Sequence, residues 1–234
     1  MFYYFYDWTY ILVLIGVLIC LAASARVRQV FAKYSRVQSR MRMTGKEAAE
    51  EILRRNGIYD VQVIHIPGNL TDHYNPGNKT LGLSDTVYQS SSVAAVGVAA
   101  HECGHAVQHA MGYAPLSIRG ALVPVANFGS AVAWPLILIG LLINGETSLL
   151  LINLGILLFS AAVLFQLVTL PVEFNASRRA VKVLGASGML YPDEVASVKK
   201  VLGAAALTYV AGAASAILQL LRLLILTGGR RRND

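Results

Sequence analysis

The sequence predicts a mainly α-helical, multi-pass membrane protein that carries a small α+β module. Two bulk properties favour this class: 55% of the 234 residues are hydrophobic and only 14% are charged, and the mean hydropathy is +0.53. Because soluble domains contain about 25% charged residues, the composition excludes an ordinary soluble protein, and it also excludes a disordered chain. The third observation is that long uncharged stretches flank a single polar segment.

The first predicted membrane helix lies in segment 1–25, where residues 8–25 carry no charge. This run of 18 residues just reaches the minimum of about 17 that a spanning helix needs. Seven of the first ten residues are aromatic, as is typical of rings at the lipid headgroups. Basic residues follow the apolar run instead of preceding it, so we expect a retained anchor with its N terminus outside.

Segment 119–172 contains two further uncharged stretches, 120–143 and 147–172, which predict a helical hairpin because only three residues separate them. Both open ends of this hairpin are basic, at Arg119 before it and at Arg178, Arg179 and Lys182 after it. The positive-inside rule therefore places both ends in the cytoplasm.

The C-terminal segment 201–234 predicts a fourth membrane helix over residues 201–226, followed by a basic tail. Its many small residues suit close packing between membrane helices, although Arg222 interrupts the apolar run. A full span would place the basic tail outside, so a helix packed across the inner leaflet is the alternative. Segment 173–200 is expected to be a helix and a connection.

The net charge of +7 comes from 20 basic and 13 acidic residues, and nine of the basic residues lie between Arg26 and Arg55. They directly follow the first apolar stretch, which points to an anionic membrane face as the partner. No nucleic-acid partner is expected, because no recognition fold accompanies the charge. Residues 26–42 have apolar side chains at helical spacing, which predicts either a helix lying on the leaflet or a solvated continuation of the first helix.

Segment 26–118 is the only polar stretch long enough for a folded cytoplasmic module. Thr44 followed by Glu47 forms a capping box, which marks a helix start, and Gly57 marks the end of that helix. The expected elements are a helix at 47–56, extended runs at 61–66 and 79–84, and a helix that starts after the serines 90–92 and continues to about Met111.

The last of these helices contains the motif His101-Glu102-Cys103-Gly104-His105. Residues four apart share one face of a helix, so both imidazoles can reach a single ion while Glu102 is directed toward a bound water. Zinc lowers the pKa of such a water to about 7, and a neighbouring carboxylate can take its proton and deliver it to a leaving amine. The spacing therefore predicts a zinc-dependent peptide hydrolase.

A third ligand is needed, and two residues are candidates. His109 lies about 12 Å along the helix axis from His101, too far to share its ion. Glu173 is the better candidate because it follows Pro171 and begins a polar stretch at the end of the hairpin. From the residues alone, an interfacial carboxylate that pairs with a nearby arginine is an equally good interpretation of Glu173.

Five short segments spread along the chain carry a resemblance to a known family: LTDHY at 70–74, LGLS at 81–84, AAHECGHAVQ at 99–108, VEFNASRRA at 172–180 and LTYVA at 207–211. In these segments the chain resembles the bacterial membrane-embedded neutral zinc metallopeptidases of gluzincin type. The resemblance implies a zincin-like module that binds one zinc ion (Zn2+) per chain through His101, His105 and Glu173. It also implies Glu102 as the catalytic base.

The resemblance raises three further expectations. Related proteases often have an aspartate four residues after the ligand glutamate, where it supports a zinc-bound histidine; this chain has Ser177 there, so Asn175 or Ser177 is expected to replace it. Such peptidases hold their substrate as an added strand, a role we assign to the run 79–84, with a structural hairpin as the alternative. Candidate oxyanion or substrate contacts are His73, Tyr74 and Tyr209.

The sequence thus predicts a membrane-bound zinc endopeptidase that acts on peptides or membrane proteins, with its site facing the cytoplasm or the inner leaflet. The alternative is a non-catalytic membrane adaptor in which the metal only stabilises the cytoplasmic module. Glu102 favours the enzyme, because a purely structural site has no use for a carboxylate beside an open metal position. The oligomeric state and the natural substrate do not follow from the residues.

Overall fold

A computed structural model describes residues 7–143 and 145–230. The aromatic residues at positions 2–6 and the basic residues at 231 and 232, which entered the sequence predictions, lie outside this range. The chain divides into two compact units. We call residues 1–23, 118–170 and 208–234 the helical unit, and residues 24–117 and 171–207 the mixed unit.

Four long apolar helices make up the described part of the helical unit, and each has residues in the mixed unit as well. Each is long and apolar enough to cross a membrane, which confirms the predicted mainly helical, multi-pass class. They are α1 (Tyr10–Tyr34), α4 (Ala114–Leu142), α5 (Glu146–Ala186) and α6 (Pro192–Arg230). Because α1 runs unbroken to Tyr34, residues 26–34 continue the first helix, and no separate surface helix forms there.

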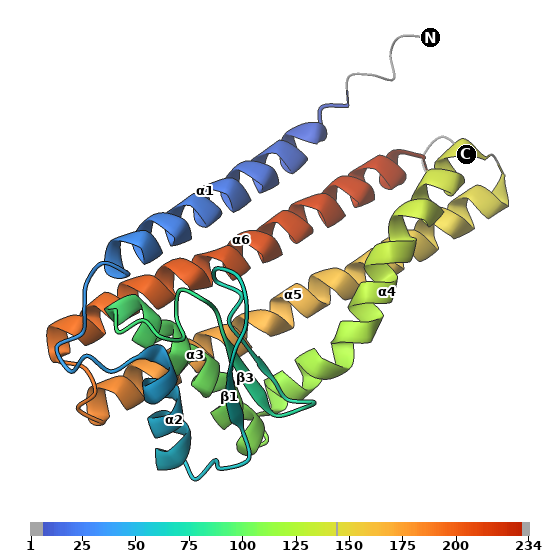
Figure 1. The fold of residues 1–234 in the computed structure, drawn as a ribbon. Helices are drawn as coiled ribbons and strands as arrows, with labels where there is room; N and C mark the ends of the chain where they lie inside the picture. Colours follow the sequence, from blue (N-terminus) through green and yellow to red (C-terminus); the bar gives the residue numbers. More distant parts are fainter. Residues whose placement is uncertain (1–6, 144, 231–234) are drawn as a thin grey trace. The chain divides into compact units, whose positions relative to one another are not determined.

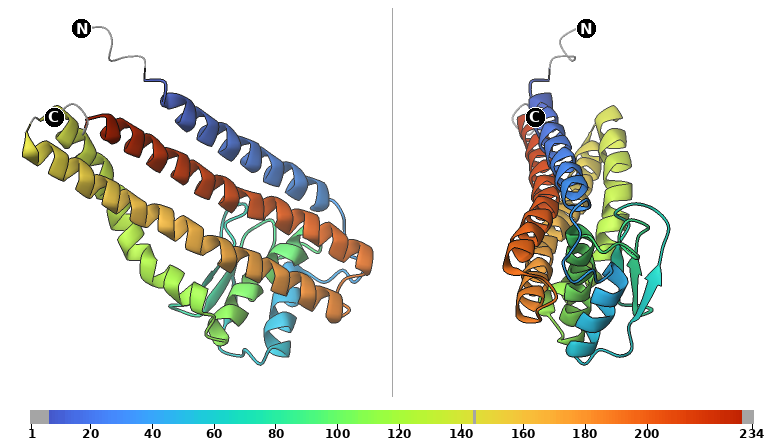
Figure 2. Two further views of the ribbon diagram at one scale, coloured as in Figure 1. Left: turned by 180° about the vertical axis from the view of Figure 1, so that it is seen from behind. Right: turned by 60° about the vertical axis from the view of Figure 1, so that its left-hand side comes forward.

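Small residues bring the membrane helices of the helical unit together. A Cβ atom on Gly16 of α1 would lie 2.7 Å from Ser215 Oγ of α6, and the two helices run side by side in both views of Figure 2. Arg222 does not break α6, because its guanidinium pairs with Asp7 at 2.8 Å and lies 4.1 Å from the ring centroid of Tyr10. The charge within the apolar run is thus paired inside this unit.

The mixed unit contains a three-stranded sheet beside α2 and α3 (Figure 1). Its strands are β1 (Gln62–His65), β2 (His73–Asn75) and β3 (Thr80–Leu83), in the order β1-β3-β2. Strand β3 pairs parallel with β1 and antiparallel with β2. The expectation that residues 79–84 offer an exposed edge is therefore wrong: both edges of β3 are already paired, and the sheet edges are β1 and β2.

Two helices complete the core of the mixed unit. Helix α2 (Gly45–Arg55) begins with the predicted capping box, in which Thr44 and Glu47 bond each other's backbone N–H groups. Helix α3 (Val93–Ala110) begins at Ser92, whose hydroxyl accepts a hydrogen bond from the N–H of Ala95. The side chains of Ile52, Val96 and Leu184 are among those buried where these helices meet α5. This core fixes α3, which carries the histidine motif.

Candidate metal centre

Two imidazoles project from consecutive turns of α3. His105 is buried and His101 is partly exposed, and their ring centroids lie 4.8 Å apart with the planes at 87°. The spacing of four residues puts both rings on one face of the helix, as the motif predicts. Their Nε2 atoms both lie close to the same carboxylate oxygen.

That oxygen belongs to Glu173 of α5. Its Oε2 atom lies 3.2 Å from His101 Nε2 and 3.5 Å from His105 Nε2, and one ligand atom from each of the three residues falls within 4.8 Å of the others. Ligands at about 2.0–2.1 Å from a tetrahedral zinc ion are separated by roughly 3.3 Å. The two imidazoles and the carboxylate thus offer three ligand atoms of the kinds that zinc takes, and the two separations to Glu173 Oε2 are close to this value.

Negative charge dominates the surroundings of the two imidazoles. Glu173 is 2% exposed. Burial alone would lower the pKa of His105, but the hydrogen bond to Glu173 and the charges of Glu102 and Glu173 outweigh it, so the pKa is raised. A site that favours positive charge on a buried imidazole also favours a bound cation.

Glu102 is buried next to the first histidine. Its charge acts on His105, and also on Asp72, whose pKa is raised mainly by burial and further by Glu102. In the described part of the chain, no hydrogen bond is formed by the Glu102 carboxylate. Asp72 itself accepts hydrogen bonds from the N–H and hydroxyl of Ser84, at 2.7 and 2.9 Å, and so ties the start of β2 to the end of β3.

Each histidine also has a partner for its second ring nitrogen. Ser177 Oγ lies 3.1 Å from His101 Nδ1, so of the two candidates it is the serine that contacts this histidine directly. Asn175 reaches the other histidine indirectly, through Gln108, whose Oε1 lies 3.0 Å from His105 Nδ1. We did not single out Gln108 from the sequence, although its position three residues after His105 places it on the same helical face.

A glycine permits the two ligand-bearing helices to meet. A Cβ atom on Gly104 would lie 2.6 Å from the backbone carbonyl oxygen of Ala176, a contact that no real Cβ atom makes. Gly104 therefore allows the backbone of α5 to approach α3 closely. Its neighbour Cys103 is fully buried against the carbonyl of Ala49, and burial raises the pKa of its thiol well above the ordinary value.

The remaining predicted contacts lie around β2 and α6. His73 and Tyr74 are both on β2; the His73 ring bonds the Thr71 carbonyl, and the Tyr74 hydroxyl bonds His109 at 2.8 Å. His109 is exposed and outside the metal cluster, as its distance along the helix requires. Tyr209 belongs to the helical unit. Roles for His73, Tyr74 and Tyr209 at the reacting group stay predictions.

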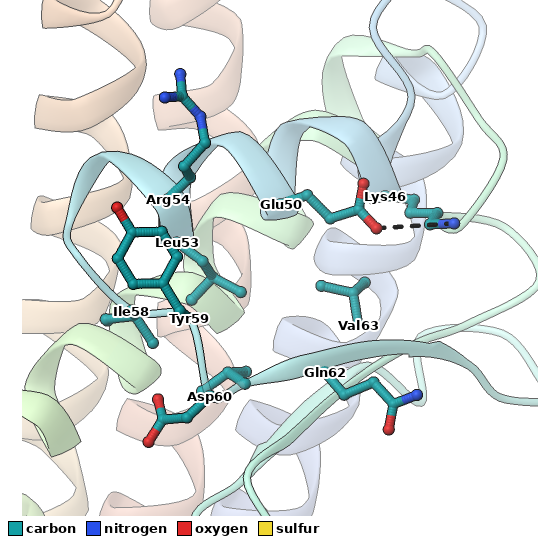
Figure 3. Close-up of a pocket in the computed structure, with 10 residues that line it drawn as sticks. Lys46, Glu50, Leu53, Arg54, Ile58, Tyr59, Asp60, Gln62 and Val63 are labelled. Carbon is teal, nitrogen blue, oxygen red and sulfur yellow. Dashed lines mark ion pairs between the residues drawn. The ribbon is translucent and has the colours of Figure 1, made fainter.

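A groove of about 680 Å³ lies between α2 and β1, and Figure 3 shows the side chains that line it. Lys46 and Glu50, both on α2, pair with each other at one end, and Asp60 and Gln62 belong to the segment on the opposite side. No residue of the metal cluster lines this groove. The groove is therefore separate from the candidate metal centre.

Comparisons with known proteins identify the family of the chain. A family model described as "Putative neutral zinc metallopeptidase" matches residues 9–228, nearly the whole chain. The chain belongs to this family. A relative in Bacillus subtilis (strain 168) is named "Putative membrane protease YugP". It is 49% identical over 212 residues, which cover 90% of this chain and 93% of the relative.

Membership in the zinc metallopeptidase family confirms the resemblance stated from the sequence, and the name of the relative agrees with a membrane location. The four apolar helices support the same location. No solved structure matches the chain significantly.

Proposed function

We propose that the chain is a membrane-bound zinc endopeptidase, with His101, His105 and Glu173 as metal ligands and Glu102 as the catalytic base. The observation that carries this gluzincin-type assignment is the convergence of three ligand atoms within 4.8 Å, with a buried carboxylate adjacent in sequence. A zinc ion bound here would acidify a water ligand and polarise the scissile carbonyl.

In the proposed reaction, Glu102 carries out both proton transfers. A carboxylate oxygen of Glu102 takes a proton from the attacking water, so that the new C–O bond forms without free hydroxide. The same carboxyl group then delivers the proton to the amide nitrogen as the C–N bond breaks, which releases a neutral amine. A peptide substrate would pair along β2, because this edge strand contacts α3.

We propose that this site faces the cytoplasm or the inner leaflet. Support comes from the basic residues Arg26, Arg28 and Lys33 at the end of α1 and from Arg178 and Lys182 on α5, since cytoplasmic flanks carry an excess of Lys and Arg. A cysteine placed at Tyr59, which is 80% exposed, tests this. A membrane-impermeant thiol reagent should label it in disrupted cells and not in intact ones.

The function is tested by casein hydrolysis and zinc content in purified parent and Glu102→Gln protein, with and without a chelator. We expect the variant to keep its zinc and lose activity by a factor of about 10²–10⁴, because only the base is removed. Glu50→Gln, the same change at an exposed carboxylate on α2, is the matched control and should be fully active. Zinc binding without any hydrolysis by the parent would favour the adaptor instead.

A further inference from the structure

Behind the metal cluster, four side chains form a continuous hydrogen-bonded chain. It runs from Arg179 through Asn175 and Gln108 to His105. Arg179 Nε lies 2.7 Å from Asn175 Oδ1, and the Gln108 Nε2 group lies 3.0 Å from the same oxygen. A branch runs from Gln108 Nε2 to the backbone carbonyl oxygen of Val172, at 2.8 Å.

Two groups in this network have a fixed hydrogen-bonding role, one as an acceptor and the other as a donor. The carbonyl of Val172 can only accept, so the end of Gln108 that faces it must be the NH₂ group. The Arg179 guanidinium can only donate, so the Asn175 atom that faces it must be the oxygen, which then accepts from Gln108 as well. The orientation of the Gln108 amide is therefore determined by its partners.

The orientation of Gln108 determines the state of His105. With both of its N–H groups directed at Val172 and Asn175, Gln108 presents its oxygen to His105 Nδ1 at 3.0 Å. His105 Nδ1 must then carry the hydrogen, which leaves the lone pair of the neutral ring on Nε2. Nε2 is the atom that lies 3.5 Å from Glu173 Oε2.

Gln108 also joins the two helices that supply the ligands. Its side chain is fully buried, and its donors reach Val172, the residue directly before Glu173. A buried amide without hydrogen-bond partners is destabilising, so each of these hydrogen bonds favours one relative placement of α3 and α5. Gln108 thus orients the ring of His105 and holds the backbone next to Glu173.

We propose that Gln108 is a positioning residue for the metal site: it holds His105 in the tautomer that binds metal through Nε2, and Arg179 and Asn175 set its orientation. This inference rests on the proposed function, since it assumes that the cluster binds zinc. The Nδ1 atom of His105 thus has a neutral amide as its partner, whereas the Nδ1 atom of His101 has the hydroxyl of Ser177.

Zinc affinity tests the inference, measured by equilibrium competition with a chelator of known affinity. Gln108→Met has similar length but cannot accept from His105, so we expect zinc to bind about 10–100-fold more weakly. Gln108→Glu retains an oxygen that can accept from Nδ1 but loses the donors toward Val172 and Asn175, so it should restore that affinity only in part. The visible absorption spectrum of the cobalt-substituted protein should change in Gln108→Met and return toward the parent in Gln108→Glu.

Val107→Ala is the matched control, because Val107 is a buried neighbour that packs in the core of the mixed unit and has no place in the hydrogen-bonded chain. It should lose stability and keep the zinc affinity and the cobalt spectrum of the parent. The inference is wrong if Gln108→Met binds zinc like the parent, or if Val107→Ala weakens zinc binding equally. If the affinities follow the predicted order but no variant hydrolyses casein, the proposed activity fails and the positioning role stands.

Discussion

In the mixed unit, buried polar side chains such as Gln108 and Glu173 are surrounded by partners, whereas in the helical unit large apolar side chains such as Leu150 and Leu157 are 66% exposed. The first pattern is that of a domain folded in water, and the second is that of helices solvated by lipid. One chain thus follows two sets of packing rules, and several of its helices pass from one to the other.

The two units also differ in what brings their helices together. In the mixed unit, hydrogen bonds and the ligand cluster join α3 and α5 in addition to the close contact at Gly104. In the helical unit, close contacts form at small residues: a Cβ atom on Gly129 of α4 would lie 2.7 Å from the Leu158 carbonyl oxygen of α5. Metal removal and glycine substitution should therefore affect the two units differently.

Removal of zinc should have the largest effect, and the effect should be confined to the mixed unit. Loss of a ligand held at 1,000 times its Kd costs about 4 kcal/mol of stability. By hydrogen exchange, we expect chelation to increase exchange in α3 and in residues 171–186, while residues 120–142 and 147–170 stay protected. His101→Ala should show the exchange pattern of the chelated parent without any chelator.

His109→Ala is the control for this measurement, since its imidazole lies outside the ligand cluster. It should respond to chelation like the parent. An equal increase of exchange in the hairpin helices would contradict the separation of the two units, because it would mean that the metal stabilises the helices in lipid as well.

Substitution of a closely packed glycine should have the second-largest effect on stability. The two units should differ in whether zinc is lost with it. Gly104→Ala forces a Cβ atom to 2.6 Å from the Ala176 carbonyl, so the helices must move apart, at a cost of about 1–3 kcal/mol and with loss of zinc. Gly129→Ala creates the same kind of clash in the helical unit, and we expect a similar loss of stability with zinc retained. Chelator competition and thermal unfolding in detergent measure both effects.

Gly203→Ala is the control for both glycines, since a Cβ atom at this helical position would meet nothing within 4 Å. It should stabilise the protein by up to about 1 kcal/mol, because alanine favours helix more than glycine does. Zinc loss in Gly129→Ala would show that packing in the helical unit controls the metal site, which the comparison of the two units does not predict.

Features with local causes could be predicted from the sequence, and features that depend on tertiary contacts could not. Long uncharged runs and the capping box have local causes, so the sequence predicts α2 and the apolar parts of the membrane helices, while α1, α5 and α6 extend beyond the predicted runs. Strand β2 has three residues, His73–Asn75, and its pairing with β3 depends on tertiary contacts, so it was missed. Helix α5 continues through Pro171 to Ala186, which residue propensities do not reveal.

At the metal site, spacing along one helix predicted His101, Glu102 and His105, because all three lie within two turns of α3. Glu173 is the better third-ligand candidate from the residues, but only the family resemblance favours a ligand over an interfacial carboxylate, since its approach depends on a helix that returns 72 residues after His101. Gln108 was overlooked for the same reason: its role depends on Val172 and Asn175, which local patterns do not place beside it.

Loss of the helix cap should have the smallest effect on stability. The effect of removing a hydroxyl group should be larger at the solvated start of α2 than in the helical unit. Thr44→Ala removes the hydroxyl that accepts the N–H of Glu47, and we expect a loss of about 1 kcal/mol with increased exchange at the start of α2. Thr44→Ser keeps the hydroxyl and should remain close to the parent. Ser160→Ala in the helical unit removes only a bond to the Ile156 carbonyl of its own helix, so its effect should be near zero. A larger loss from Ser160→Ala than from Thr44→Ala would contradict the comparison, because it would assign hydroxyl groups a greater stabilising role in lipid than at a solvated helix end.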